Sequence, residues 1–159
     1  MTRASRARDA ALALPLLLSL LACGGRESER IDPDQRSAVL CVWEIYSTLQ
    51  IVGELCAVDP ADPFQGALRD SVSRLESFIT DNTRIPQSQL DAGKRRKRLL
   101  ERQEKAQHSP AEIAARCRGD GSEGAAMYQE LRARDPEEIR REIGRLLEVP
   151  PQKVTNPCS

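Results

Sequence analysis

The chain is poor in aromatic residues and in histidine, and both shortages restrict what it can be. Of its 159 residues only two are Phe, two Tyr and one Trp, so large rings can fill no more than one modest core. His108 is the single histidine, and any Ser-His or Cys-His catalytic pair would have to use it. It stands beside Ser109 at the expected end of a helix, where an exposed histidine is the simpler interpretation.

The chain also lacks the patterns that catalytic and metal sites require. It has no C-x-x-C motif to accompany its one histidine, which argues against a zinc site. No carboxylate stands in an apolar setting that would tune it as an acid beside a second one acting as a base. We therefore expect a protein that is not an enzyme and that holds no metal or cofactor.

The chain as a whole has no excess of positive or negative charge that would indicate a class of partner. Lys and Arg total 24, and so do Asp and Glu. A neutral balance gives no general attraction to nucleic acid or to an anionic surface. We expect no nucleic-acid partner, and any electrostatic contact has to come from a local patch.

The apolar run near the N-terminus is too short to span a membrane. Arg3, Arg6 and Arg8 precede twelve uncharged residues, AALALPLLLSLL. As a helix they would cover about 18 Å, well below the roughly 30 Å of a hydrocarbon core. A basic start followed by a short apolar run is typical of a signal peptide for export.

The end of this run resembles the lipobox of bacterial lipoproteins. The residues are Leu20-Leu21-Ala22-Cys23-Gly24. The resemblance implies cleavage before Cys23 by signal peptidase II, with diacylglycerol on the Cys23 sulfur and an acyl chain such as palmitate on the new amino terminus. It also implies attachment to an envelope membrane, and Gly24 after the cysteine favours the outer membrane over the inner. The alternative is an ordinary secreted protein that is cut near the same place.

Four further cysteines agree with export to an oxidising compartment. Cys41, Cys56, Cys117 and Cys158 are an even number and indicate two disulfides. Cys41 and Cys56 would lie about 22 Å apart on one helix, too far for a disulfide. In an up-and-down bundle Cys56 lies near the turn before Pro110, which favours Cys56 with Cys117 and Cys41 with Cys158 over the swapped pairing.

The apolar stretch Ser37 to Val58 is the expected central element. Glu44 and Glu54 are its only charged residues, and apolar side chains recur around the whole helix. Helical patterns follow, separated by Pro and Gly, with no sustained strand alternation. They begin near 62, 88, 109, 122 and 135. We expect an all-α, disulfide-braced bundle of five to six helices, in which 1–22 is the signal peptide, 23–35 the lipidated cysteine and a flexible tether, and 36–159 a single domain.

The strongest local charge lies in the helix expected at 88–107. It comprises Lys94, Arg95, Arg96, Lys97 and Arg98, followed one turn later by Arg102. Five consecutive residues rotate through about 500° and surround a helix. Two interpretations stand: a solvated helix, or the contact surface for an acidic partner or an anionic envelope group.

This helix has few apolar residues, so we expect it to be the most exposed one. Within it, ion pairs of Lys97 with Glu101 and of Glu101 with Lys105 would add support. Replacing Lys94, Arg95, Lys97 and Arg98 by glutamine is then expected to leave folding nearly unchanged.

Taken together, these features predict a lipid-anchored, periplasm-facing protein of the cell envelope that acts as a protein-binding, scaffold or inhibitor module. The membrane, reached through Cys23, and an envelope protein are its expected partners. The alternative is a small envelope hydrolase or lipid-handling protein. A concave apolar cavity next to His108 would favour the alternative, whereas a filled core and a convex charged surface would favour binding.

Overall fold

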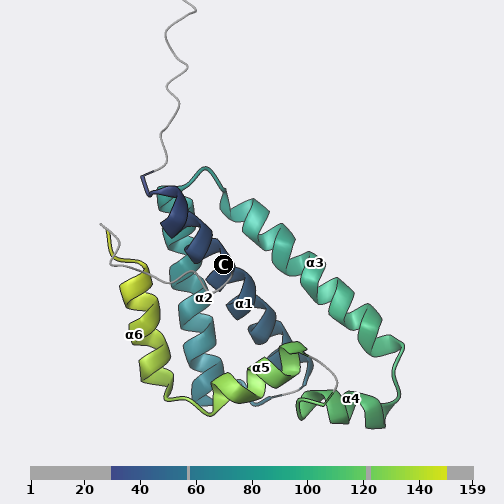
Figure 1. The fold of residues 1–159 in the computed structure, drawn as a ribbon. Coiled ribbons are helices and arrows are strands. Elements are labelled where there is room, and N and C mark those ends of the chain that lie inside the picture. The colour runs from purple at the N-terminus through teal and green to yellow at the C-terminus, as the bar shows by residue number, and fades with distance from the viewer. Residues whose placement is uncertain (1–29, 57, 121–122, 150–159) are drawn as a thin grey trace, which may run out of the picture.

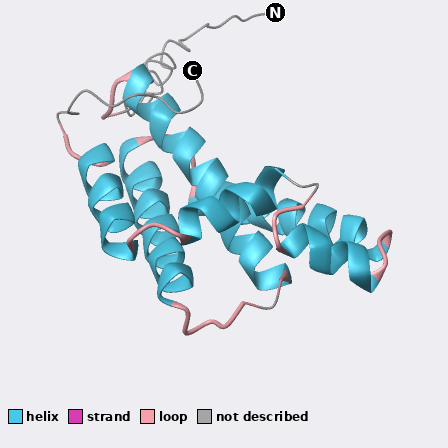
Figure 2. Cartoon of the chain, turned by 60° about the horizontal axis from the view of Figure 1, so that its bottom comes forward, coloured by secondary structure: helices cyan, strands magenta, loops and turns pink. Residues whose placement is uncertain are grey.

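The protein forms the expected all-α bundle. A computed structural model describes residues 30–56, 58–120 and 123–149, and this part contains six helices and no strand (Figures 1 and 2). The helices are α1 (Pro33–Leu55), α2 (Pro63–Asn82), α3 (Gln87–Ala106), α4 (Pro110–Cys117), α5 (Glu123–Arg132) and α6 (Pro136–Leu146).

Four helices begin at a proline that follows a capping residue. Asp32, Asp62, Ser109 and Asp135 each precede a proline, and each side chain accepts a hydrogen bond from a backbone N–H of the first turn. Such a cap satisfies a donor that the helix leaves open, and proline at the first position loses nothing there. Ser109 and Glu112 also form the expected capping box.

The start of α1 corrects the predicted boundary between tether and domain. The helix begins at Pro33, inside the range 23–35 that we expected to be a flexible tether. The Asp32 side chain accepts from the Gln35 N–H at 2.8 Å, and Ile31 is buried. The Gln35 amide donates to the carbonyls of Leu146 and Glu148, which ties this turn to the end of α6. Residues from Ile31 onward therefore belong to the domain.

The core lies where α1 and α2 pack together. α1 also packs against α3 and α5, and α2 against α6, which lies on the opposite side of α2 from α3 in Figure 1. Phe64 and Tyr128 meet edge to face, with ring centroids 5.3 Å apart. The fully buried side chains of the core include Val39, Leu49, Leu68, Leu75, Ile79 and Ile139.

α1 is also the one helix of the described part that is long and apolar enough to cross a membrane. In its most apolar window 61% is buried inside the domain. A core helix of a bundle has this composition as well.

The two most exposed helices are α3 and α4. Leu90 is the only buried residue of α3, whereas α4 has none. Thirteen of the 20 residues of α3 are exposed, against four of the eight residues of α4, so the expectation that the basic helix would be the most exposed is confirmed. α4 has eight residues, and it is joined to α1 by the disulfide between Cys56 and Cys117 rather than by buried apolar side chains.

Candidate functional site

The basic residues of α3 divide into an inner and an outer group. Lys94, Lys97 and Arg98 point toward α1 and α2 and are partly buried, whereas Arg95, Arg96 and Arg102 are exposed. The division follows from the helical rotation of about 100° per residue, which puts positions 94, 97 and 98 near one face. The predicted contact segment therefore contains two sets of residues with different partners.

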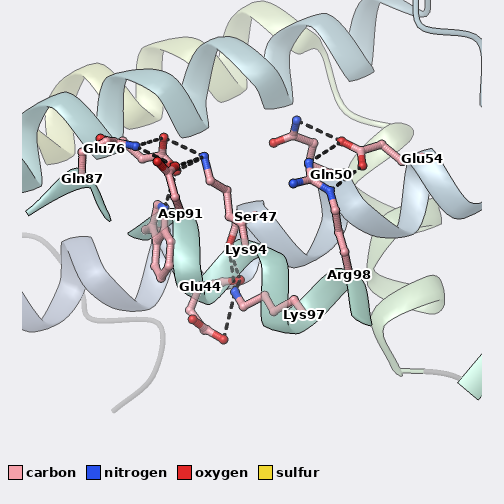
Figure 3. A network of polar contacts seen from close by, with 11 residues as sticks. Glu44, Ser47, Gln50, Glu54, Glu76, Gln87, Asp91, Lys94, Lys97 and Arg98 are labelled. Carbon is pink, nitrogen blue, oxygen red and sulfur yellow. Dashed lines mark hydrogen bonds and ion pairs between the residues drawn. The ribbon is translucent and has the colours of Figure 1, made fainter. Parts of the chain in front are cut away.

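Glu76 on α2 is the centre of the inner contacts (Figure 3). It is 8% exposed, and its carboxylate lies 2.7 Å from the ammonium of Lys94. The indole N–H of Trp43 donates to one of its oxygens at 3.1 Å, and the Gln87 amide donates to the other at 3.1 Å. A buried carboxylate needs such partners, and this one joins α1, α2 and α3.

Lys97 makes a second set of contacts with α1. Its ammonium lies 2.9 Å from the Glu44 carboxylate and donates to the Ser47 hydroxyl at 2.7 Å. It also lies over the Trp43 ring, 4.9 Å from the centroid, where a cation is attracted by the ring face. Burial lowers the pKa of Lys97, and the hydrogen bond and charge of Glu44 oppose that shift.

Two more cations of α3 reach the C-terminal half of α1. Arg98 binds Glu54 with two hydrogen bonds of 3.0 Å, and Lys105 donates to the Leu55 carbonyl at 2.8 Å. The pairs that we predicted within α3 are replaced by these contacts, because Lys97 and Lys105 both reach across to α1. Their long side chains extend farther than one helical turn.

The outer face of α3 carries a different combination of residues. It comprises Arg95, Arg96, Leu99, Leu100 and Arg102, which are all exposed and are spaced three or four residues apart along one side. Leu99 is 57% exposed and Leu100 is 54% exposed. Among the described residues no carboxylate forms an ion pair with the three arginines. We call these five residues the outer face of α3.

A small cleft lies at the C-terminal end of α3, between α1, α4 and α5. Its volume is about 50 Å³. The apolar lining comes from Val52, Leu55, Ile113, Ala125 and the disulfide of Cys56 and Cys117, and the charged lining from Glu101, Glu104, Lys105, His108 and Arg116. In Figure 1 the chain turns back after α3, so that α4 lies beneath the C-terminal end of α3.

The cleft lies beside His108, which makes it the place to look for the alternative function. A single water needs roughly 10 to 15 Å³ of cavity, so the cleft has room for about four water-sized groups and not for a lipid chain. The lining includes no Ser or Thr, and both of its cysteines are in the disulfide. The neighbouring Ser109 caps α4, where its hydroxyl accepts from the Glu112 N–H, and it does not line the cleft. The nearest charged partner of His108 is Glu112, 4.0 Å away.

The cysteine predictions have different outcomes. Cys56 and Cys117 form a disulfide with their Cα atoms 5.7 Å apart, so the preferred pairing is confirmed for this bond. Cys41 is also disulfide-bonded, and its predicted partner Cys158 lies outside the described residues. Cys23, the predicted site of lipid attachment, lies outside them too. Within the described part no three metal-ligating side chains come together.

In comparisons with protein families, curated proteins and solved structures, the chain has no significant match.

Two features of the site were missed from the sequence. Neither the buried position of Glu76 nor the inner role of Lys94 was predicted. One signal was available: Glu44 and Glu54 are the only acids on the apolar central helix, and charges there require partners. A basic helix elsewhere in the chain is the natural source of those partners.

Proposed function

We propose that this protein is a lipid-anchored, periplasm-facing component of the bacterial cell envelope whose helical domain binds an acidic surface of another protein. The single observation that carries the binding role is the outer face of α3. None of its three arginines forms an ion pair with a carboxylate in the described part of the chain, and two exposed leucines lie between them. The leader and the disulfide support an exported location.

The composition of the outer face favours a protein partner. Arginine is enriched in protein interfaces and lysine is depleted, and the cations here are all arginines, whereas Lys94, Lys97 and Lys105 all bond toward α1 or α2. Arginine also pairs with carboxylates through two parallel hydrogen bonds. Leu99 and Leu100 add apolar contact at the centre of the same face.

A membrane surface is the weaker candidate for the outer face. A helix that lies in the membrane interface uses a broad apolar face with several large side chains. The outer face of α3 offers two leucines, and its neighbours at 92 and 103 are Ala and Gln. Two leucines bury too little area for stable insertion, so contact with anionic lipid is kept as an outcome of the test.

Lipid attachment at Cys23 is the first prediction from this proposal. The native protein is expected to partition into detergent, and its mass should exceed that of the processed polypeptide by the mass of the lipid. The Cys23→Ser variant should stay in the aqueous phase and carry no added mass. Intact mass spectrometry and detergent partitioning measure both properties. Equal partitioning of the two proteins into water would show that the lipobox resemblance is misleading.

The second prediction compares two triple variants of one helix. Replacing Arg95, Arg96 and Arg102 by glutamine should keep the free energy of unfolding within about 0.5 kcal/mol of the native value, because exposed charges without ion pairs contribute little. Binding of the partner should weaken at least about tenfold, most strongly at low salt, where exposed charges are screened least. Urea unfolding and a salt series of binding measurements test both statements.

The matched control replaces Lys94, Lys97 and Arg98 by glutamine. It removes the same charge from the same helix, yet it should destabilise the domain, because these side chains bind Glu76, Glu44 and Glu54. From the sequence we expected the variant with Lys94, Arg95, Lys97 and Arg98 all replaced by glutamine to fold normally. That expectation is revised, because three of the four residues bind these carboxylates. If both triple variants bind the partner as well as the native protein does, the outer face of α3 is only a solvated surface. The proposal would also be overturned if the outer-face variant lost binding to anionic vesicles and not to a protein.

A further inference from the structure

The cleft beside α4 contains a carboxylate that the fold leaves without a partner. Glu101 lines the cleft and is partly buried. Within the described part of the chain it forms no ion pair and no hydrogen bond through its side chain. A partly buried carboxylate without a partner carries an unfavourable desolvation term. A cation that entered the cleft would relieve it.

The other charged groups of the cleft are already engaged. Glu104 binds Arg116 at 2.5 Å, and Lys105 donates to the Leu55 carbonyl. His108 lies closest to Glu112, at 4.0 Å. These contacts pair the remaining charges with one another or with the backbone, so Glu101 is the group that a ligand would meet.

The end of α1 adds a second feature that favours a cation. Leu55 and Cys56 line the cleft where α1 ends. A helix carries a partial negative charge at its C-terminus, and α1 has no basic residue in its last turn. Lys105 donates to the Leu55 carbonyl there, so the chain's own cation meets one of the open carbonyls at this end.

We propose that this cleft binds a lysine side chain of a partner protein. Its methylene stem would contact Val52, Leu55 and Ile113, and its ammonium would lie against the Glu101 carboxylate. The volume of about 50 Å³ leaves room for only a few water-sized groups, so a narrow, unbranched stem that ends in a cation, as in lysine, fits better than the broader guanidinium of arginine. The site is separate from the outer face of α3, and either one can fail without the other.

The charge of Glu101 sets the direction of the pH dependence. Burial raises its pKa first, the neighbouring Glu104 raises it further, and Arg116 opposes the shift. Binding of an ammonium needs the ionised carboxylate, so affinity should fall as the pH drops through this raised pKa. Glu104, Lys105, His108 and Arg116 also face the cleft. The pH series is therefore run in the native protein and in Glu101→Gln.

The test uses two short peptides that differ in the terminal ammonium group of one side chain. Acetyl-Ala-Lys-Ala-amide is titrated into the full protein with methyl-labelled Val52, Leu55 and Ile113, and acetyl-Ala-norleucine-Ala-amide serves as the uncharged control. The lysine peptide should shift these methyl resonances and bind about tenfold more tightly than the norleucine peptide, as a charge-assisted hydrogen bond provides. In Glu101→Gln the preference and its pH dependence should disappear.

A matched variant guards against a general effect of surface charge. Glu130→Gln removes an exposed acid of α5 that does not line the cleft, and it should bind both peptides as the native protein does. Equal affinity for the two peptides in the native protein would overturn the proposal. So would an undiminished preference for lysine in Glu101→Gln, or the absence of any shift at the three methyl groups.

Discussion

Replacing both Cys56 and Cys117 by serine is expected to lower the free energy of unfolding by about 4 kcal/mol. The two cysteines are 61 residues apart in the chain, and closing a loop of that length restricts the unfolded state by roughly this amount. Small domains have a stability of about 5 to 15 kcal/mol, so the variant should lose a large part of its margin. Urea unfolding of the oxidised protein and the double variant measures the difference.

The local effect of the same change distinguishes α4 from the rest of the bundle. α4 has no buried residue, so without the disulfide it keeps mainly the Arg116 contact with Glu104 and the hydrogen bond from Gln129 to the Cys117 carbonyl. Amide exchange should therefore accelerate most in α4, and the cleft should lose one wall. Unchanged unfolding and unchanged exchange in α4 would show that other contacts hold this helix.

Glu76→Ala is expected to destabilise the domain by about 3 kcal/mol. It leaves the Lys94 ammonium and the Trp43 indole N–H without their acceptor between three helices, and removal of one partner from a buried pair has a cost of this size. Glu76→Gln keeps an acceptor for Trp43 and should recover part of the loss. Chemical unfolding, followed by the fluorescence of the single Trp, measures all three proteins.

The matched control for Glu76 is the more exposed ion pair between Glu54 of α1 and Arg98 of α3. Glu54→Ala removes the partner of Arg98, but both side chains are substantially exposed, so the loss should stay below about 1 kcal/mol. Comparable effects of Glu76→Ala and Glu54→Ala would mean that the Glu76 contacts do not hold α3 in place.

The sequence predicted the helices well because their signals are local. Asp62-Pro63, Ser109-Pro110 and Asp135-Pro136 each mark a helix start, and all three are confirmed. The same signal at Asp32-Pro33 was read as tether because it lies in a polar stretch. Its helical start is stabilised by contacts of Gln35 with the far end of the domain, which no local pattern reveals.

The sequence could not predict which residues of α3 face the bundle, and the reason is geometric. Consecutive cations surround a helix, so the pattern alone does not say whether Lys94 or Arg95 faces the bundle. That choice depends on where Glu76 and Glu44 lie after α1 and α2 have packed. The cleft depends likewise on the angle at which α3 leaves the bundle and on the turn into α4. By contrast, the pairing of Cys56 with Cys117 followed from helix lengths and from the order of the turns.

The most direct test of the proposed binding role is site-specific photocrosslinking from α3 in intact envelopes. A photoreactive residue at position 100 is compared with one at position 73, which is exposed on α2. Position 100 should yield one discrete protein adduct that weakens when Arg95, Arg96 and Arg102 are replaced by glutamine, and position 73 should not yield it. If both positions give the same adducts, or position 100 gives only lipid adducts, then the outer face of α3 does not bind a protein partner.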